Sequence, residues 1–181
     1  AGATSGGNGG AGVSVASGAS LSNSGVITGG SGTATGGFGG AGVYLAGSSG
    51  SLSNSGSIAG GSGEAGHGGT GLSFASGGTL ANAGTIAAGS GGATAVNFGT
   101  GAARLILDPQ ASFIGAVVAS ATAANVLELA GSPGTLSNLT ASGAEFGVTA
   151  LTNFGQITID SGAYWVLAAS NTFSAGSTLT N

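Results

Sequence analysis

A seven-residue motif, Leu-x-Asn-x-Gly-x-Ile, occurs four times in this sequence of 181 residues. Repetition of a motif along a chain is the signature of a solenoid, in which each copy belongs to one turn and buries its apolar side chains against the next turn. The repeat therefore limits the chain to a stack of similar turns. The motif positions are Leu21, Asn23, Gly25, Ile27, Leu52, Asn54, Gly56, Ile58, Leu80, Asn82, Gly84, Ile86, Leu151, Asn153, Gly155 and Ile157.

Short β-prone stretches accompany the motif, and in them apolar residues alternate with others, as in Val13-Ser14-Val15. Alternation with period two places the branched side chains on one face of a strand. No apolar stripe with helical spacing persists, and 42 residues are Gly, which disfavours helices. We predict an all-β fold, a right-handed parallel β-helix of about seven coils, with residues 1–181 as a single domain.

The spacing of the repeat differs between the two halves. Leu52 follows Leu21 by 31 residues and Leu80 follows Leu52 by 28, whereas in the second half apolar residues recur every 22 positions. One such series is Leu107, Leu129, Leu151 and Phe173, and another is Phe113, Thr135, Ile157 and Leu179. We therefore predict coils with insertions in residues 1–100 and compact 22-residue coils in residues 101–181.

The insertions are the glycine-rich segments 29–42 and 60–71, with a shorter equivalent after Ile86. Gly is the residue that adopts positive φ without a steric penalty. We expect these segments to be loops that leave one corner of the solenoid, with glycine serving for turning rather than for packing.

The Asn of each motif copy has two structural interpretations. In a straight strand it shares the interior face with the Leu, and stacked copies form a ladder of side-chain amides. In a bent chain Asn-x-Gly marks a corner, because Asn tolerates the left-handed conformation and bonds to the local backbone. We favour the corner, and under either interpretation the Asn is structural.

Charged residues are scarce: one Arg and five acidic residues give a net charge of −4, and mean hydropathy is +0.45. This composition disfavours disorder, which combines low hydropathy with high charge. It also disfavours nucleic acid and anionic lipid as partners, since both attract Lys and Arg. No apolar run is long enough for a membrane helix, so direct membrane insertion is not expected.

Cysteine is absent, which excludes disulfides and thiolate metal sites. The absence suits a chain that crosses an oxidising compartment unfolded, and we expect an extracellular or cell-surface location. The first residue is Ala1 and no basic-then-apolar leader follows, so we expect a mature product or a piece of a longer chain.

The candidates for chemistry are few. His67 lies three residues after Glu64 in a glycine-rich segment, where both are best interpreted as solvated loop residues rather than as a metal or acid–base site. Glu128 lies one 22-residue coil after residue 106, which stands between Arg104 and Asp108 on the previous turn. We therefore expect a surface ion pair among Arg104, Asp108 and Glu128. No cofactor, metal or catalytic residue is predicted.

The alternative of a carbohydrate-active β-helix enzyme, a polysaccharide lyase or hydrolase, requires clustered carboxylates, with Asp108, Glu128 and Asp160 as the residues to test. The acidic residues are instead spread from Glu64 to Asp160. We therefore expect a protein that is not an enzyme.

The segment Ala163-Tyr-Trp-Val-Leu167 contains the only Trp, at position 165. Trp165 and Leu167 share a face, so one of Tyr164 and Trp165 is inside. Filling of the core or a terminal cover is the preferred interpretation over a sugar-stacking platform, because large aromatic side chains are usually buried.

Three segments carry a family resemblance. Residues 105–115 (LILDPQASFIG), 125–131 (NVLELAG) and 151–165 (LTNFGQITIDSGAYW), together with the motif copies, resemble the passenger region of bacterial type V autotransporters and related haemagglutinin-like adhesins. The resemblance implies a secreted or cell-surface β-helix that presents adhesive surface to a host or matrix glycan or protein. It implies no catalytic residue at any position of this sequence.

The two ends of the chain are in phase with the repeat. Leu179-Thr-Asn181 begins another copy of the motif, and Ala1-Gly2-Ala3-Thr4 would continue it. Neither end carries a polar or helical cap, and few charges oppose stacking. We therefore expect self-association, either end to end into a fibre or laterally.

Overall fold

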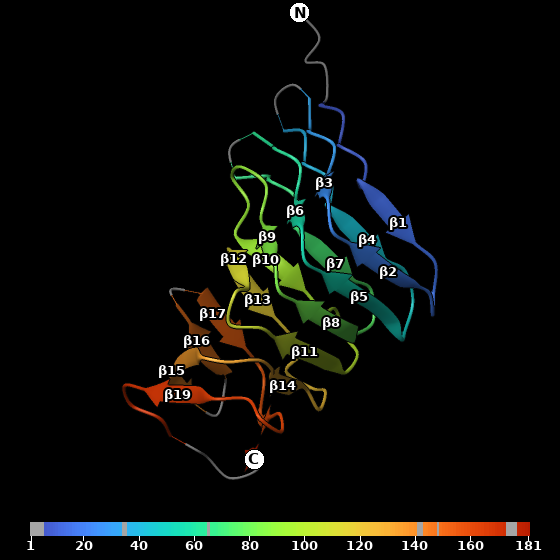
Figure 1. Cartoon of the computed structure of the whole chain (residues 1–181). Coiled ribbons are helices and arrows are strands. Elements are labelled where there is room, and N and C mark those ends of the chain that lie inside the picture. Colours follow the sequence, from blue (N-terminus) through green and yellow to red (C-terminus); the bar gives the residue numbers. More distant parts are fainter. Residues whose placement is uncertain (1–5, 34–35, 65, 141–142, 148, 173–176) are drawn as a thin grey trace, which may run out of the picture.

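The computed structural model describes residues 6–33, 36–64, 66–140, 143–147, 149–172 and 177–181, and every regular element within these ranges is a strand. The strands stack as a parallel β-solenoid (Figure 1), so the predicted all-β parallel β-helix is confirmed. A helix of the length and apolarity needed to cross a bilayer is not found among the described residues.

Three sheets form the sides of the solenoid. In spatial order, the nine-stranded sheet contains β1 (Val13–Val15), β4 (Val43–Leu45), β7 (Leu72–Phe74), β10 (Thr94–Asn97), β13 (Ala116–Val118), β17 (Thr149–Thr152), β16 (Gly143–Phe146), β15 (Gly134–Thr140) and β19 (Trp165–Ala168). The seven-stranded sheet contains β2 (Ser20–Asn23), β5 (Gly50–Asn54), β8 (Gly78–Asn82), β11 (Ala103–Leu107), β14 (Val126–Leu129), β18 (Gln156–Ile159) and β20 (Thr178–Thr180). The four-stranded sheet contains β12 (Ser112–Ile114), β9 (Thr85–Ala87), β6 (Ser57–Ala59) and β3 (Val26–Thr28).

The interior is filled by columns of like side chains. The longest column runs through the seven-stranded sheet and contains Leu21, Leu52, Leu80, Leu105, Leu127, Ile157 and Leu179. A second column contains Ile27, Ile58, Ile86 and Phe113. Most members are fully buried, and burial of each such side chain stabilises the fold by about 1.5–3 kcal/mol. The alternation seen in the sequence is thus the inward face of each strand.

The solenoid makes about five turns, fewer than the seven coils predicted from the chain length. Strands rise regularly from β1 to β14, and beyond them β18 and β20 extend the seven-stranded sheet. The difference arises because residues that would form further coils are used in a glycine-rich extension and in an antiparallel meander.

The predicted 22-residue register holds for only part of the second half. Leu129 pairs with Leu107 as predicted. Leu151, however, pairs with Val117 in the nine-stranded sheet, and the neighbour of Leu129 on the next strand is Ile159. The prediction that Leu107, Leu129 and Leu151 form one column is therefore wrong at its third member.

The second 22-residue series is also only partly correct. Ile157 pairs with Leu179, but Phe113 on β12 is not paired with Thr135 on β15. The cause is the antiparallel meander β15–β16–β17, which lengthens the step from β14 to β18 to 30 residues. Residues 101–181 are therefore not a run of compact coils, and Phe173 lies outside the described residues.

The fourth motif copy occupies a different place in the coil from the first three. In the first three copies the Leu lies in the seven-stranded sheet and the Ile in the four-stranded sheet. In the fourth, Leu151 lies in the nine-stranded sheet and Ile157 in the seven-stranded sheet. The motif thus specifies a corner between two sheets, and the same seven-residue motif occurs at two different corners of the solenoid.

The glycine-rich segments form a packed structure rather than separate loops. Residues 8–12, 29–33, 36–42, 60–63, 66–71 and 88–92, called here the glycine extension, project from the corner beyond β3, β6 and β9 (Figure 1). Backbone hydrogen bonds of 2.8 Å connect outgoing and returning segments in the series Gly10, Gly30, Gly40, Gly61, Gly69 and Gly89, each residue after the first donating to the one before.

Bonds between equivalent segments recur every three residues in the glycine extension. Gly9 and Gly12 donate to the carbonyls of Phe38 and Ala41, which lie on the next returning segment. Three residues per turn is the repeat of a polyproline II helix, whose backbone groups all point outward and are free to bond to neighbours. Each segment therefore bonds to its neighbours on more than one side.

The expectation that glycine serves for turning in these segments is wrong for most positions. Among the described residues of the glycine extension, positive φ occurs at Gly36, Gly66 and Gly91. Elsewhere close packing requires Gly: a Cβ on Gly40 would lie 2.1 Å from the Gly10 carbonyl oxygen, and one on Gly61 would lie 1.9 Å from that of Gly30. The expectation that the extension leaves one corner is correct.

Candidate functional surfaces

The asparagines of the first three motif copies form a buried amide ladder. They are the last residues of β2, β5 and β8, at the corner that leads to the four-stranded sheet. The Asn23 Nδ2 donates to the Asn54 Oδ1, and the Asn54 Nδ2 donates to the Asn82 Oδ1, both at 2.8 Å. The Asn23 side chain also exchanges bonds of 3.2 Å with the backbone of Gly25. The interior ladder and the corner turn, posed as alternatives, are therefore both present.

Asn153 in the fourth copy takes the left-handed corner conformation, with φ of 68°. Its Nδ2 donates to the Ala119 carbonyl at 2.7 Å, and its own carbonyl accepts from the Asn125 Nδ2 at 2.8 Å. Asn125 is buried, and its Oδ1 accepts from the Ala103 N–H at 2.9 Å. Asn125 lies just before the alternating residues of β14, a place typical of a corner, although it belongs to no copy of the seven-residue motif.

Arg104 and Glu128 form the predicted ion pair on the outer face of the seven-stranded sheet, with the Arg104 Nε donating to the Glu128 Oε2 at 2.8 Å. Glu128 pairs with Ile106, as the spacing predicted. Asp108 does not join them, since its Oδ1 accepts from the Gln110 N–H in a corner turn. Half of the Arg104 side chain is exposed, so the pair is a surface feature.

The remaining acidic residues do not converge on one point. Asp108 and Asp160 follow strands separated by β14, and two strand spacings amount to about 10 Å. Glu145 accepts a bond from the Asn138 Nδ2 at 2.5 Å. Within the described ranges no group of three or more His, Asp or Glu side chains is arranged to hold a metal ion.

His67 is less solvated than its place in a glycine-rich segment predicted. Its ring stacks on Phe38 with centroids 4.1 Å apart, and its Nδ1 is buried without a hydrogen-bond partner among the described residues. Glu64 is exposed and meets His67 through the backbone, where the His67 N–H donates to the Glu64 carbonyl. The two side chains therefore do not form a site.

Trp165 is buried, and its Nε1 donates to the Ala130 carbonyl at 3.1 Å, whereas Tyr164 is 63% exposed. The prediction that one of the two fills the core is confirmed. Trp165 also packs near Phe146, with ring centroids 6.0 Å apart.

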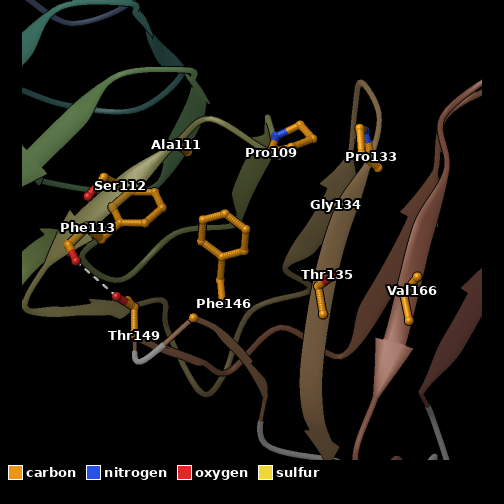
Figure 2. Close-up of a pocket in the computed structure, with 11 residues that line it drawn as sticks. Pro109, Ala111, Ser112, Phe113, Pro133, Gly134, Thr135, Phe146, Thr149 and Val166 are labelled. Carbon is orange, nitrogen blue, oxygen red and sulfur yellow. Dashed lines mark hydrogen bonds between the residues drawn. The ribbon is translucent and has the colours of Figure 1, made fainter.

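An open groove of about 570 Å³ lies where the four-stranded sheet ends at β12. One wall carries Ser112 and Phe113 of β12, and the opposite wall carries Gly134 and Thr135 of β15. Figure 2 shows the ring of Phe146 standing between the two walls. The spacing of the sequence did not predict this groove.

The groove is uncharged. Its lining consists of aromatic, aliphatic, Pro and Gly residues with three hydroxyl side chains, those of Ser112, Thr135 and Thr149. The Thr149 Oγ1 donates to the Phe113 carbonyl at 3.0 Å, drawn as a dashed line in Figure 2. Such a surface offers hydrogen bonds and apolar contact but no group suited to acid–base chemistry.

Comparison of the chain with protein-family models, with curated proteins and with solved structures finds no match.

Proposed function

We propose that this chain is a non-catalytic structural and adhesive rod at the bacterial cell surface or outside the cell, a passenger segment of the autotransporter type. The observation that carries the proposal is that, among the described residues, no strand pairs with the outer edges of β1, β2 and β3. Such edges are templates for another strand, and solenoids normally cover them with a cap. Copies stack end to end through them.

The backbone at this end is arranged for stacking. The Val13 N–H donates to the Gly42 carbonyl and the Val15 carbonyl accepts from Ala46, so β1 bonds to β4 through Val13 and Val15. Since alternate residues of a parallel strand face opposite neighbours, the N–H and C=O of Ser14 point away from the solenoid. The same alternation turns the backbone of Ser22 outward.

The side chains at this end favour another copy as the neighbour. The inward residues Val13, Val15, Leu21 and Ile27 are only partly buried, so a further turn would bury more apolar surface. With a net charge of −4 over the whole chain, electrostatic repulsion between copies is weak. Adhesion to a host or matrix glycan or protein then takes place along the sides of the rod.

End-to-end stacking is tested with edge prolines. Ser14→Pro and Ser22→Pro together remove two outward N–H groups without removing a bond to β4 or β5, as Pro is tolerated on an edge strand. Light scattering and electron microscopy should show rods that lengthen with concentration for the wild type and for a Ser14→Ala, Ser22→Ala control, and single short rods for the Pro variant. Short wild-type rods at every concentration would contradict stacking.

The non-catalytic part of the proposal is tested by replacing Asp108, Glu128 and Asp160 together with Asn, Gln and Asn. Wild type and variant should both bind immobilised glycans or matrix proteins to the same extent and release no product from a polysaccharide panel. Product release by the wild type that the triple variant loses would establish the enzyme alternative instead.

A further inference from the structure

The groove at β12 exists because two successive turns fail to pair. β12 follows β11, and β15 follows β14, and since β11 and β14 are paired in parallel, β12 and β15 are corresponding strands of adjacent turns. The first half of β15 nevertheless pairs with β19 and not with β12. The second half of β15 pairs with β16 in the antiparallel meander, which draws β15 away from β12.

Both walls of the groove present main-chain hydrogen-bonding groups. β12 bonds to its neighbour through Ser112, which donates to Gly84 at 2.9 Å, and Ile114, which accepts from Ala88 at 2.8 Å. The N–H and C=O of the intervening Phe113 therefore face the groove. On β15 the Gly134 N–H donates to the Tyr164 carbonyl at 3.0 Å, so by the same alternation the main chain of Thr135 faces the groove.

The Thr149 side chain already behaves as a substitute for a strand. Its hydroxyl supplies a hydrogen bond to the Phe113 carbonyl that a neighbouring strand would supply in a continuous sheet. Because unpaired backbone groups in an apolar setting are costly, two facing strand edges favour an occupant that can bond to both. The uncharged lining selects an uncharged occupant.

We propose that this groove binds an extended, uncharged peptide segment of a partner polypeptide by β-strand addition between β12 and β15. The bound segment continues the four-stranded sheet β3–β6–β9–β12 and connects it to β15 and β19. Its alternate residues accept from the Phe113 N–H, since the Phe113 carbonyl is bonded to Thr149, and bond to the main chain of Thr135, and its apolar side chains pack on the ring of Phe146 (Figure 2). The proposal is independent of end-to-end stacking.

The probe is the acetylated, amidated peptide Gly-Thr-Ile-Ala-Ala, which copies residues 84–88, the segment that β12 already pairs with on its other edge. With the ¹⁵N-labelled full chain, the peptide should shift the amide signals of Phe113 and Thr135 and slow their hydrogen exchange at least tenfold. The same peptide with an N-methyl group on Ile is the matched control, and it should bind at least tenfold more weakly because one strand bond is removed.

Two protein variants separate the backbone bond from the side chain. Thr135→Pro removes the N–H that faces the groove and should weaken the peptide at least tenfold, whereas Thr135→Val keeps that N–H and should change binding less than twofold. The proposal is overturned by equal binding of the N-methyl peptide, by shifts confined to the open edge at Val26 on β3, or by occupation of the groove by cellohexaose and not by the peptide.

Discussion

The two halves of this solenoid are built on the same column of inward residues, yet they differ in how faithfully each turn copies the last. From β1 to β9 all three sheets are continuous, and the glycine extension and the asparagine ladder rise in step with them. From β10 onward the seven-stranded sheet continues, but the four-stranded sheet stops at β12 and an antiparallel meander follows.

One interior column differs between the regular and the irregular half. Asn23, Asn54 and Asn82 stack as amides, and the next residue in that column is Leu107. Similar turns stack with their strands paired in register. Dissimilar turns leave strand edges and a groove, so in this molecule the groove lies in the irregular half and the asparagine ladder and glycine extension lie in the regular half.

The largest expected effect tests whether the glycine extension is packed through its backbone. Gly40→Ala should lower the free energy of unfolding by about 3 kcal/mol or more, because the new Cβ would meet the backbone of a neighbouring segment. Gly10→Ala in the same extension is the matched control, since a Cβ there meets nothing within 4 Å. Urea unfolding followed by circular dichroism measures both, and an equal loss in the two variants would show that the packing argument fails.

The next effect distinguishes the ladder from the buried Asn of the second half. Asn54→Ala should cost about 2–3 kcal/mol, because it breaks the two buried amide–amide hydrogen bonds that join Asn54 to Asn23 and Asn82. Its cost should be strongly non-additive with Asn82→Ala and additive with Asn125→Ala, whose bonds go to the backbone. If the double-mutant cycle shows no coupling energy between Asn54 and Asn82, the hydrogen bonds of the ladder do not contribute to stability.

The smallest expected effect concerns the outer face. In a double-mutant cycle of Arg104→Ala and Glu128→Ala, the coupling energy should be below about 1 kcal/mol, because the Arg104 side chain is half exposed and solvent screens its charge. High salt should reduce it further. A larger coupling that persists in 1 M salt would indicate that this pair holds β11 and β14 together.

Sequence reasoning was most successful where the chain repeats itself. The strand alternation, the parallel stacking of Leu21, Leu52 and Leu80, and the position of Glu128 over Ile106 all follow from spacing. It failed at the meander, because the 22-residue interval between Leu129 and Leu151 persists in the sequence although the two residues lie in different sheets. An equal interval between apolar residues in the sequence does not reveal whether the chain between them reverses direction.

The motif and the scarcity of charge were enough to specify an all-β solenoid with a dry interior, since period-two alternation and recurrence are local properties of the chain. The use of glycine for close backbone contact, the reuse of one motif at two corners, and the groove between β12 and β15 depend on which turn lies beside which. Those relations arise from contacts between segments distant in sequence, whose geometry is set when the turns pack.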